Sequence, residues 1–110
     1  MLDITTNNYA EAIKDSAVLE FWTEWCEPSK YILELLSNLD INYYRVNADT
    51  EPDLMERLRI VGLPALVYFI GGKIVGFRGS CDYFTDDIMG KLILSDIEHI
   101  NLARRNPDNG

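Results

Sequence analysis

One cysteine lies where a protein chain readily turns a thiol into a nucleophile. Cys26 follows an apolar run from Ala17 to Trp22 and precedes Pro28, after which apolar residues recur at helical spacing: Ile32, Leu35, Leu36 and Leu39. Because proline suits the first turn of a helix, this pattern predicts that Cys26 lies at a helix N-terminus, on the turn that leaves a strand. Free N–H groups and the positive end of the helix dipole stabilise a thiolate at such a position.

Three polar side chains near Cys26 bear on the charge of its thiol. Ser29 can donate a hydrogen bond to the thiolate and so favour the charged form, although a hydroxyl has no redox chemistry of its own. The carboxylates of Glu24 and Glu27 act in the opposite direction, because one negative charge disfavours another nearby. The sequence leaves open which of these influences wins.

The composition restricts the partners and cofactors that we expect. A net charge of −8 and an isoelectric point near 4.4 argue against nucleic acid or an anionic membrane as the main partner. Two cysteines are too few for a disulfide scaffold, and a single histidine, His99, argues against a structural zinc site. The chain also lacks the G-x-G-x-x-G element of flavin and nicotinamide sites, so we expect neither a cofactor nor a metal.

Length and hydropathy favour one ordinary domain. The 110 residues are 47% hydrophobic, but no apolar run approaches the roughly 18 residues of a membrane span. The chain starts at Met1 without a basic region followed by an apolar stretch, so we see no signal peptide and expect a cytoplasmic protein. We expect a single domain over residues 1–105 and a flexible tail over residues 106–110.

Strands and helices should alternate along the chain. The expected strands cover residues 2–5, 17–22, 43–47, 65–70 and 73–78, and the expected helices cover residues 8–15, 26–38, 50–60 and 84–102. The strand that begins at Ala17 should be central, because its apolar run is almost unbroken. Gly71 and Gly72 should close a tight hairpin between the last two strands.

Caps and buried faces can be assigned to these helices. Asn8 and Glu11 match a capping box, and Thr50 can cap a helix with Pro52 in its first turn. The residues that we expect to face inward are Tyr9, Ala12, Ile13, Leu54, Met55, Leu58, Phe84, Ile88, Leu92, Ile93, Ile97 and Ile100. His99 should be an ordinary surface residue of the last helix.

Three segments in this order carry a resemblance to a known family. Residues Glu20–Lys30, Val61–Phe69 and Gly71–Gly76 resemble the active-site segment, the cis-proline segment and the following hairpin of thioredoxins. The resemblance covers nearly the whole chain. It implies a thioredoxin-like α/β fold, in which helices flank a central mixed β-sheet.

The resemblance implies thiol–disulfide oxidoreductase chemistry, with one departure from the family pattern. Thioredoxins use two cysteines in C-x-x-C, and here Ser29 takes the second position. Cys26 could attack a protein disulfide, but Ser29 cannot resolve the mixed disulfide that forms. Two versions remain open, a natural monothiol form and an engineered Cys→Ser variant that traps substrates. The competing interpretation is a redox-inactive module that binds proteins.

The resemblance also assigns supporting roles. The family's buried acid falls at Glu20 and its basic partner at Arg45, which leaves a structural ion pair and a proton-transfer role equally open. The substrate-binding positions carried over from the family are Trp25, Glu27, Pro28, Leu63, Pro64 and Gly79, with Pro64 expected in the cis form. Trp22 is expected in the core.

Cys81 and the partners complete the expectations. Cys81 lies in a loop that could bring a resolving thiol to Cys26, although a bystander cysteine is the simpler interpretation.

The expected partners are a disulfide-containing protein substrate and a reductase of the thioredoxin-reductase type, in cell redox homeostasis and electron transport. We expect a monomer.

Overall fold

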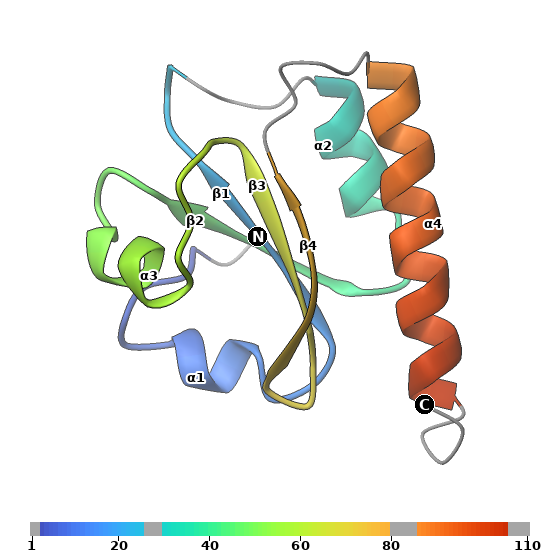
Figure 1. Cartoon of the computed structure of the whole chain (residues 1–110), viewed down its shortest axis with the longest axis horizontal. Coiled ribbons are helices and arrows are strands. Elements are labelled where there is room, and N and C mark those ends of the chain that lie inside the picture. The colour runs from blue at the N-terminus through green and yellow to red at the C-terminus, as the bar shows by residue number, and fades with distance from the viewer. Residues whose placement is uncertain (1–2, 26–29, 80–85, 106–110) are drawn as a thin grey trace.

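The computed structural model describes residues 3–25, 30–79 and 86–105, and for Tyr31, Asp86 and Asp87 it describes the backbone alone. Within these ranges the chain forms three layers. A four-stranded sheet of order β2-β1-β3-β4 has helices α1 and α3 on one face and helices α2 and α4 on the other (Figure 1). The architecture is the mixed α/β arrangement expected from the order of elements.

Strand β1 (Ala17–Trp22) is central, as its apolar sequence predicted. It pairs in parallel with β2 (Asn42–Asn47) and antiparallel with β3 (Ala65–Ile70). The helical crossover between β1 and β2 explains their parallel pairing, because such a connection returns the chain in the same direction. The bounds of β1 and β3 are those predicted.

Strand β4 (Lys73–Gly79) forms the edge of the sheet next to β3. The hairpin turn uses Gly71 and Gly72 at φ angles of 58° and 83°, which glycine adopts more easily than other residues. The register then shifts, since Tyr68 pairs with Gly76 but Phe69 pairs with Ile74. The additional residue, Val75, makes a bulge in the edge strand.

Successive side chains of β1 point to opposite faces of the sheet, so the core is divided into two clusters. Leu19 and Phe21 point to the side of α1 and α3, where they pack with Val46, Val67 and Phe69. Val18 points to the other side and packs under α2 and α4 with Leu66 and Tyr68. Because β1 is covered on both faces, five of its six residues are buried. This burial explains its nearly continuous apolar sequence.

Helix α1 (Tyr9–Ala12) is shorter than predicted, and its expected capping box is wrong. The Asn8 carboxamide oxygen accepts a hydrogen bond from the Thr5 N–H at 2.8 Å and so turns away from the helix. Glu11 instead pairs with Lys14 at 2.9 Å. The inward face is as predicted, since Ile13 is buried and Tyr9 packs beside it.

Helix α3 (Pro52–Arg57) carries Pro52 in its first turn, as predicted. The cap at Thr50 is wrong, because the helix begins one residue later and Glu51 is the N-cap residue. The Thr50 hydroxyl donates to the Asn47 carbonyl at 3.2 Å and thus stabilises the preceding turn. Leu54 is fully buried in the core, as expected.

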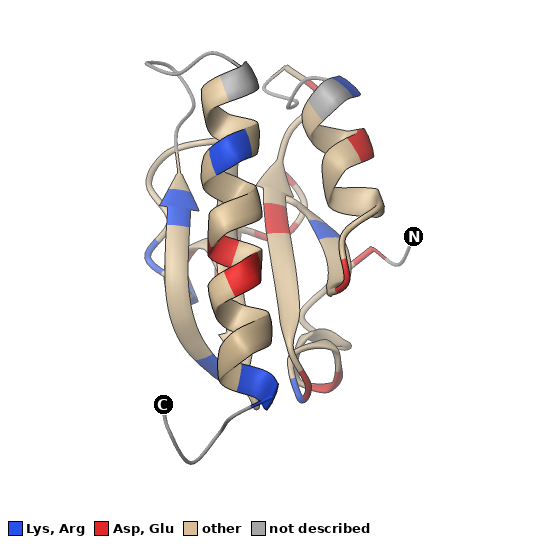
Figure 2. Ribbon diagram, turned by 90° about the vertical axis from the view of Figure 1, so that its right-hand side faces the viewer, with Lys and Arg blue, Asp and Glu red and all other residues tan. Residues whose placement is uncertain are grey.

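Helices α2 (Lys30–Ser37) and α4 (Asp86–Arg105) lie together on the other face of the sheet. In α4, Ile88 was expected inward but is 46% exposed, and Met89 is buried in its place. Spacings of four, four and three residues connect Met89 to the buried positions Ile93, Ile97 and Ile100. Basic residues close α4 at its C-terminal end, where they suit the helix dipole (Figure 2).

The N-terminal segment contributes less to the sheet than predicted. Within the described residues, Asp3 makes one isolated bridge to Arg45, and the Ile4 N–H donates to the Arg45 carbonyl at 2.9 Å. Ile4 is nevertheless buried and anchors this segment in the core. None of the helices in the described ranges combines the length and apolar character needed to cross a membrane.

Candidate functional site

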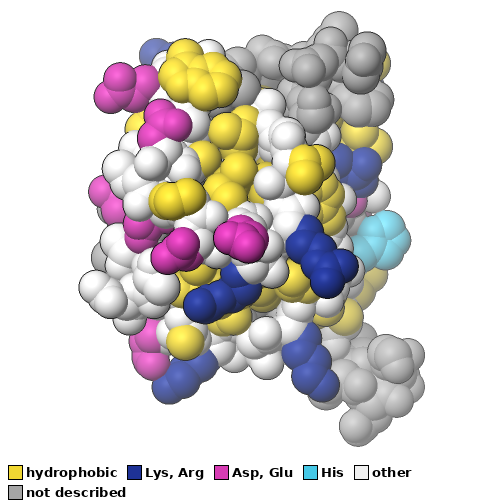
Figure 3. Space-filling view, turned by 60° about the vertical axis from the view of Figure 1, so that its left-hand side comes forward, with side chains coloured by type: hydrophobic (Ala, Val, Ile, Leu, Met, Phe, Trp, Pro, Cys, Tyr) yellow, Lys and Arg dark blue, Asp and Glu magenta, His cyan; other side chains and the backbone are white. Residues whose placement is uncertain are grey.

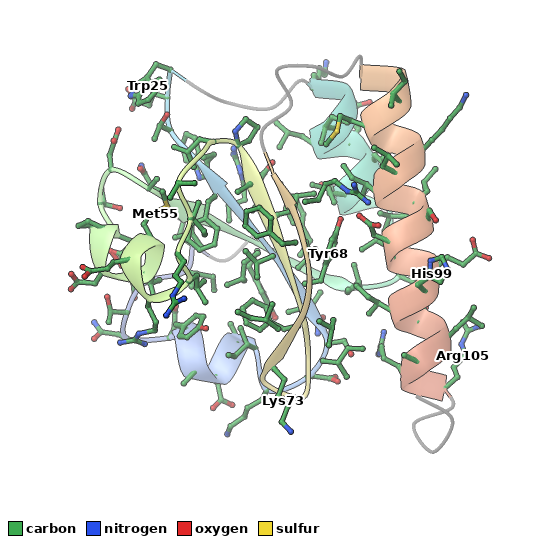
Figure 4. All side chains as sticks on the ribbon, viewed as in Figure 1. Trp25, Met55, Tyr68, Lys73, His99 and Arg105 are labelled. Atoms are coloured by element: carbon green, nitrogen blue, oxygen red, sulfur yellow. The ribbon has the colours of Figure 1, made fainter. Side chains whose placement is uncertain are left out.

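Two segments distant in sequence meet at one end of the sheet. Phe21 of β1 pairs with Ala65 of β3, and these strands run in opposite directions. The residues that leave β1 therefore lie beside the turn that enters β3, which includes Pro64. Trp25, the last described residue after β1, is 76% exposed and extends away from the sheet (Figure 4).

The entering turn also exposes apolar surface. Val61 is 99% exposed, whereas Leu63 packs against the core cluster under α1 and α3. Figure 3 shows one face of the molecule, on which hydrophobic side chains gather beside acidic and basic groups. Val61 and Trp25 are thus exposed apolar side chains on the two segments that meet at this end of the sheet.

The predicted nucleophile and its neighbours lie outside the described residues. This applies to Cys26, Glu27, Pro28 and Ser29, and also to Cys81. Their expected roles remain predictions. The described chain resumes with Lys30, the exposed first residue of α2.

The peptide bond between Leu63 and Pro64 is cis, as predicted. Pro64 is half-buried and lines a small pocket between the sheet and the two helices above it. Glu20 and Arg78 line the same pocket, together with apolar side chains that include Ile32. The turn before β3 therefore shares its pocket with the buried acid of β1.

Gly79 differs from the expectation in its position. It is the last residue of β4, paired with Ala65, and not part of the following loop. A Cβ atom at Gly79 would lie 2.6 Å from Cε1 of Phe77, so the Phe77 ring covers this glycine. The absence of a side chain at Gly79 makes room for that ring. The approach of a substrate to Gly79 remains a prediction.

Glu20 and Arg45 form the ion pair that the sequence suggested. They are opposite each other in the parallel register of β1 and β2, and Arg45 Nε lies 2.8 Å from Glu20 Oε1. The Glu20 side chain is 0% exposed and that of Arg45 is 15% exposed. A carboxylate buried to this degree requires a partner, since its desolvation is otherwise strongly unfavourable.

The core position expected for Trp22 is wrong, because the residue lies at the boundary of the core beside Arg45. Its ring is half-buried, and the guanidinium carbon of Arg45 lies 4.1 Å from the ring centroid. This distance is within the range of cation–π attraction. The indole N–H of Trp22 and the hydroxyl of Thr23 are buried and find no hydrogen-bond partner among the described residues.

A second polar cluster joins β4 and β3 to α4. Arg78 binds Asp96 through two hydrogen bonds, from Nε at 3.0 Å and from Nη2 at 2.8 Å, and the Tyr68 hydroxyl donates to Asp96 at 2.9 Å. Figure 4 shows Tyr68 between the sheet and α4. Burial, reinforced by the Asp96 carboxylate, raises the pKa of Tyr68 far above its usual range. The hydrogen bond to Asp96 raises the pKa of Arg78.

Sequence reasoning assigned no role to Tyr43, Arg78 or Asp96. Tyr43 is two residues before Arg45 in β2, so alternation places both on the same face of the strand, and this was the available signal that its hydroxyl could reach Glu20. The contact between Arg78 and Asp96 joins an edge strand to the last helix, and no local pattern indicates it. Among the described residues, no group of three potential ligands is arranged to hold a metal ion. His99 is exposed on α4, as expected (Figure 4).

Comparison with known proteins decides the family. The sequence model of the family described as Thioredoxin matches residues 1–83, which include β1, both helices of the crossovers and the hairpin. The chain belongs to the thioredoxin family. Thioredoxin 1 of Chlorobaculum tepidum is 32% identical over 62 residues, which cover 51% of this chain and 61% of that thioredoxin. The match therefore spans less than two thirds of that relative.

Two further proteins are similar to this thioredoxin-family chain. It is 25% identical over 79 residues to the bifunctional thioredoxin reductase/thioredoxin of Mycobacterium leprae, covering 63% of this chain and 17% of that protein. The crystal structure of Malassezia sympodialis thioredoxin superimposes with a TM-score of 0.72 at 19% identity, over 88% of this chain and 87% of that one. This superposition confirms the thioredoxin-like fold.

Proposed function

We propose that this chain is a thiol–disulfide oxidoreductase that attacks protein disulfides through Cys26. One observation carries the proposal: the family match covers residues 1–83, which include Cys26 and the hairpin. The exposed Trp25, at the same end of the sheet as the cis Pro64, supports it. A nucleophile directly after Trp25 is thus next to a surface that a protein substrate can contact.

The reaction begins with the Cys26 thiolate. It attacks one sulfur of a substrate disulfide, a bond forms between Cys26 and that sulfur, and the other substrate sulfur leaves as a thiolate. In a C-x-x-C protein, the second cysteine then attacks the mixed disulfide and releases the reduced substrate. Because Ser29 cannot do so, release needs another thiol, from solution, from the substrate itself or from Cys81.

Ser29 decides how far the reaction proceeds. With a serine at this position, the protein accumulates the mixed disulfide, exchanges it with small thiols, or isomerises disulfides by reversible attack. Either a natural monothiol protein or an engineered trapping variant has this behaviour. Cys81 could supply a resolving thiol, and an intact-mass measurement of the oxidised monomer tests this, since an internal disulfide removes two hydrogen atoms.

The substrate binds beside Cys26 as an extended segment in this proposal. Leu63 and Pro64 present backbone to it, Trp25 supplies apolar contact, and Glu27, Pro28 and Gly79 complete the surface. The exposed Trp25 and Val61 support this assignment, because they offer apolar area without closing a pocket.

A reductase partner follows from the same chemistry. A thioredoxin-type reductase would reduce the C-x-x-C form of this chain, and the Mycobacterium leprae relative carries both activities in its name. We propose a cytoplasmic location and a monomeric state on the sequence grounds given above.

A protein-binding module without redox activity is the second candidate. The serine at position 29 favours it, since such a module does not need the second cysteine, and the exposed Trp25 and Val61 could dock a partner directly. Cys26→Ala separates the two candidates. Partner binding that survives this substitution favours the module, whereas loss of activity favours thiol chemistry.

Reduction of insulin disulfides with dithiothreitol as the electron source tests the main proposal. The chain and its Ser29→Cys variant are measured side by side. A nearly inactive serine form together with an active cysteine form supports the oxidoreductase, with only the resolving thiol missing. Two inactive forms contradict the oxidoreductase and favour the binding module.

A further inference from the structure

One oxygen atom of the buried Glu20 accepts two hydrogen bonds. The Tyr43 hydroxyl donates to Oε1 at 2.5 Å, and Arg45 Nε donates to the same atom at 2.8 Å. Hydrogen bonds to the charged form of a carboxyl group favour that form, and a guanidinium adds a full positive charge. Protonation of Glu20 would leave the nearly buried Arg45 charge without this counter-ion.

Arg45 is held from two sides. Its Nε lies against Glu20, and its guanidinium carbon lies 4.1 Å from the centroid of the Trp22 ring. The sheet produces this geometry, because Arg45 is opposite Glu20 in the register and Trp22 is two residues further along β1 on the same face. Arg45 therefore has little freedom to leave the carboxylate.

Among the described residues, no unpaired negative charge faces Glu20 in this pocket, although its apolar lining disfavours any buried charge. From β4, Arg78 lines the pocket beside Glu20, and Asp96 of α4 binds Arg78 in turn. The remaining residues that line this pocket are apolar: Ile32, Pro64, Leu66, Met89 and Ile93. The described charged groups around Glu20 are thus two arginines and one carboxylate that is already paired.

We propose that Tyr43 is a positioning residue, which together with Arg45 keeps Glu20 ionised throughout the pH range in which the protein works. Glu20 is then a fixed negative charge and does not carry protons for the reaction. The importance of this assignment for thiol chemistry rests on the proposed function. The charge state of Glu20 can be measured without any thiol chemistry.

Trp22 provides the measurement, because its ring touches the guanidinium that pairs with Glu20. The chain has two tryptophans, so Trp25→Phe leaves Trp22 as the single fluorophore. In this background, Trp22 emission is recorded from pH 8 downward, and far-UV circular dichroism marks the onset of acid unfolding. The Glu20→Gln variant gives the Trp22 emission that is expected when residue 20 carries no negative charge beside Arg45 at any pH.

Tyr43→Phe is the decisive variant and Tyr44→Phe is its matched control. Both remove one hydroxyl from β2, but Tyr44 packs against the core cluster on the opposite face of the sheet. We expect the parent to show no emission change above about pH 4.3, the ordinary value for glutamate. Tyr43→Phe should raise the midpoint of the change by about 1 pH unit, while Tyr44→Phe leaves it in place.

A purely structural role for Tyr43 gives a different result. In the Glu20→Gln background, Tyr43→Phe should no longer alter the pH profile, whereas a structural effect would persist there. A parent transition above about pH 4.3 without loss of circular dichroism overturns the proposal. Equal midpoints for Tyr43→Phe and Tyr44→Phe also overturn it. Failure of the insulin assay would contradict the proposed oxidoreductase and leave this result intact.

Discussion

Glu20 of β1 and Arg78 of β4 lie in one row across the sheet, with Leu66 of β3 between them. Opposite charges this close in a sheet could neutralise each other, yet each has a partner of its own. Glu20 pairs with Arg45 on the neighbouring strand, and Arg78 pairs with Asp96 on α4. One ion pair joins two strands of the sheet and the other joins the sheet to α4, so each can be tested separately.

Removal of the Asp96 charge should loosen the contact between β4 and α4. In Asp96→Asn, Arg78 loses its counter-ion and Tyr68 loses a charged acceptor. Because both side chains of the ion pair are partly exposed, we expect a loss of only about 1–2 kcal/mol in the free energy of unfolding. Urea unfolding measures it. Glu98→Gln, an exposed position on the same helix, is the control and should change stability by less than about 0.5 kcal/mol. Equal effects at the two positions would contradict the role of Asp96.

Tyr68 should make the protein less stable in strong alkali. Its pKa is raised in the folded state by burial first and by Asp96 second, while the unfolded chain has the ordinary tyrosine value. Above about pH 10 the unfolded state therefore releases a proton that the folded state keeps, and stability falls with rising pH by up to about 1.4 kcal/mol per pH unit. Below that pH the contribution is fully present.

Tyr68→Phe tests this alkaline dependence, since it removes the titrating hydroxyl and keeps the ring. The free energy of unfolding of the variant should decline less steeply above about pH 10 than that of the parent. Urea unfolding at several alkaline pH values gives both slopes. Parallel slopes would show that Tyr68 has no part in the decline.

Gly79→Ala should displace the Phe77 ring. The new Cβ would lie 2.6 Å from Phe77 Cε1, which no side chain tolerates. Phe77 is 51% exposed and can rotate away, so we expect a modest loss of about 1 kcal/mol. In a Phe77→Ala background the same substitution should have almost no effect on urea unfolding. An undiminished loss in the double variant would show that the backbone, and not the Phe77 ring, requires glycine.

Trp25 should matter for the reaction and hardly for stability. Its side chain is 76% exposed, so Trp25→Ala should change the free energy of unfolding by less than about 0.5 kcal/mol. In the Ser29→Cys background, the rate of insulin reduction should fall about tenfold, because an exposed aromatic often dominates a binding surface. Ile74→Ala on the edge strand, 53% exposed, is the control and should retain the full rate. Equal rates in the two variants would exclude Trp25 from the substrate surface.

The sheet was predictable from sequence because its signals are local and strong. The bounds of β1 and β3 follow from apolar runs, and the hairpin follows from Gly71 and Gly72. The caps at Asn8 and Thr50 failed for one physical reason. Short polar side chains can bind nearby backbone groups in several ways, and here they bind the Thr5 N–H and the Asn47 carbonyl.

The site was predictable only where the backbone alone brings residues together. The family resemblance paired Glu20 with Arg45 correctly, and the parallel register of β1 and β2 places the two residues opposite each other. The contact of Tyr43 with Glu20 depends on how a long side chain leans along its strand, which periodicity does not encode. Ile88 was placed inward because Leu92 and Ile93 are both apolar, so the pattern fits two rotations of α4 that differ by one residue.

The bulge at Val75 has a consequence for behaviour in concentrated solution. Strand β4 exposes Ile74, Val75 and Phe77 along an open edge, a composition that invites another strand to add on and start aggregation. The additional residue interrupts the regular spacing of N–H and C=O groups, so that an incoming strand cannot pair along the whole length of β4. The bulge therefore limits the length of this apolar edge that a second strand could pair with.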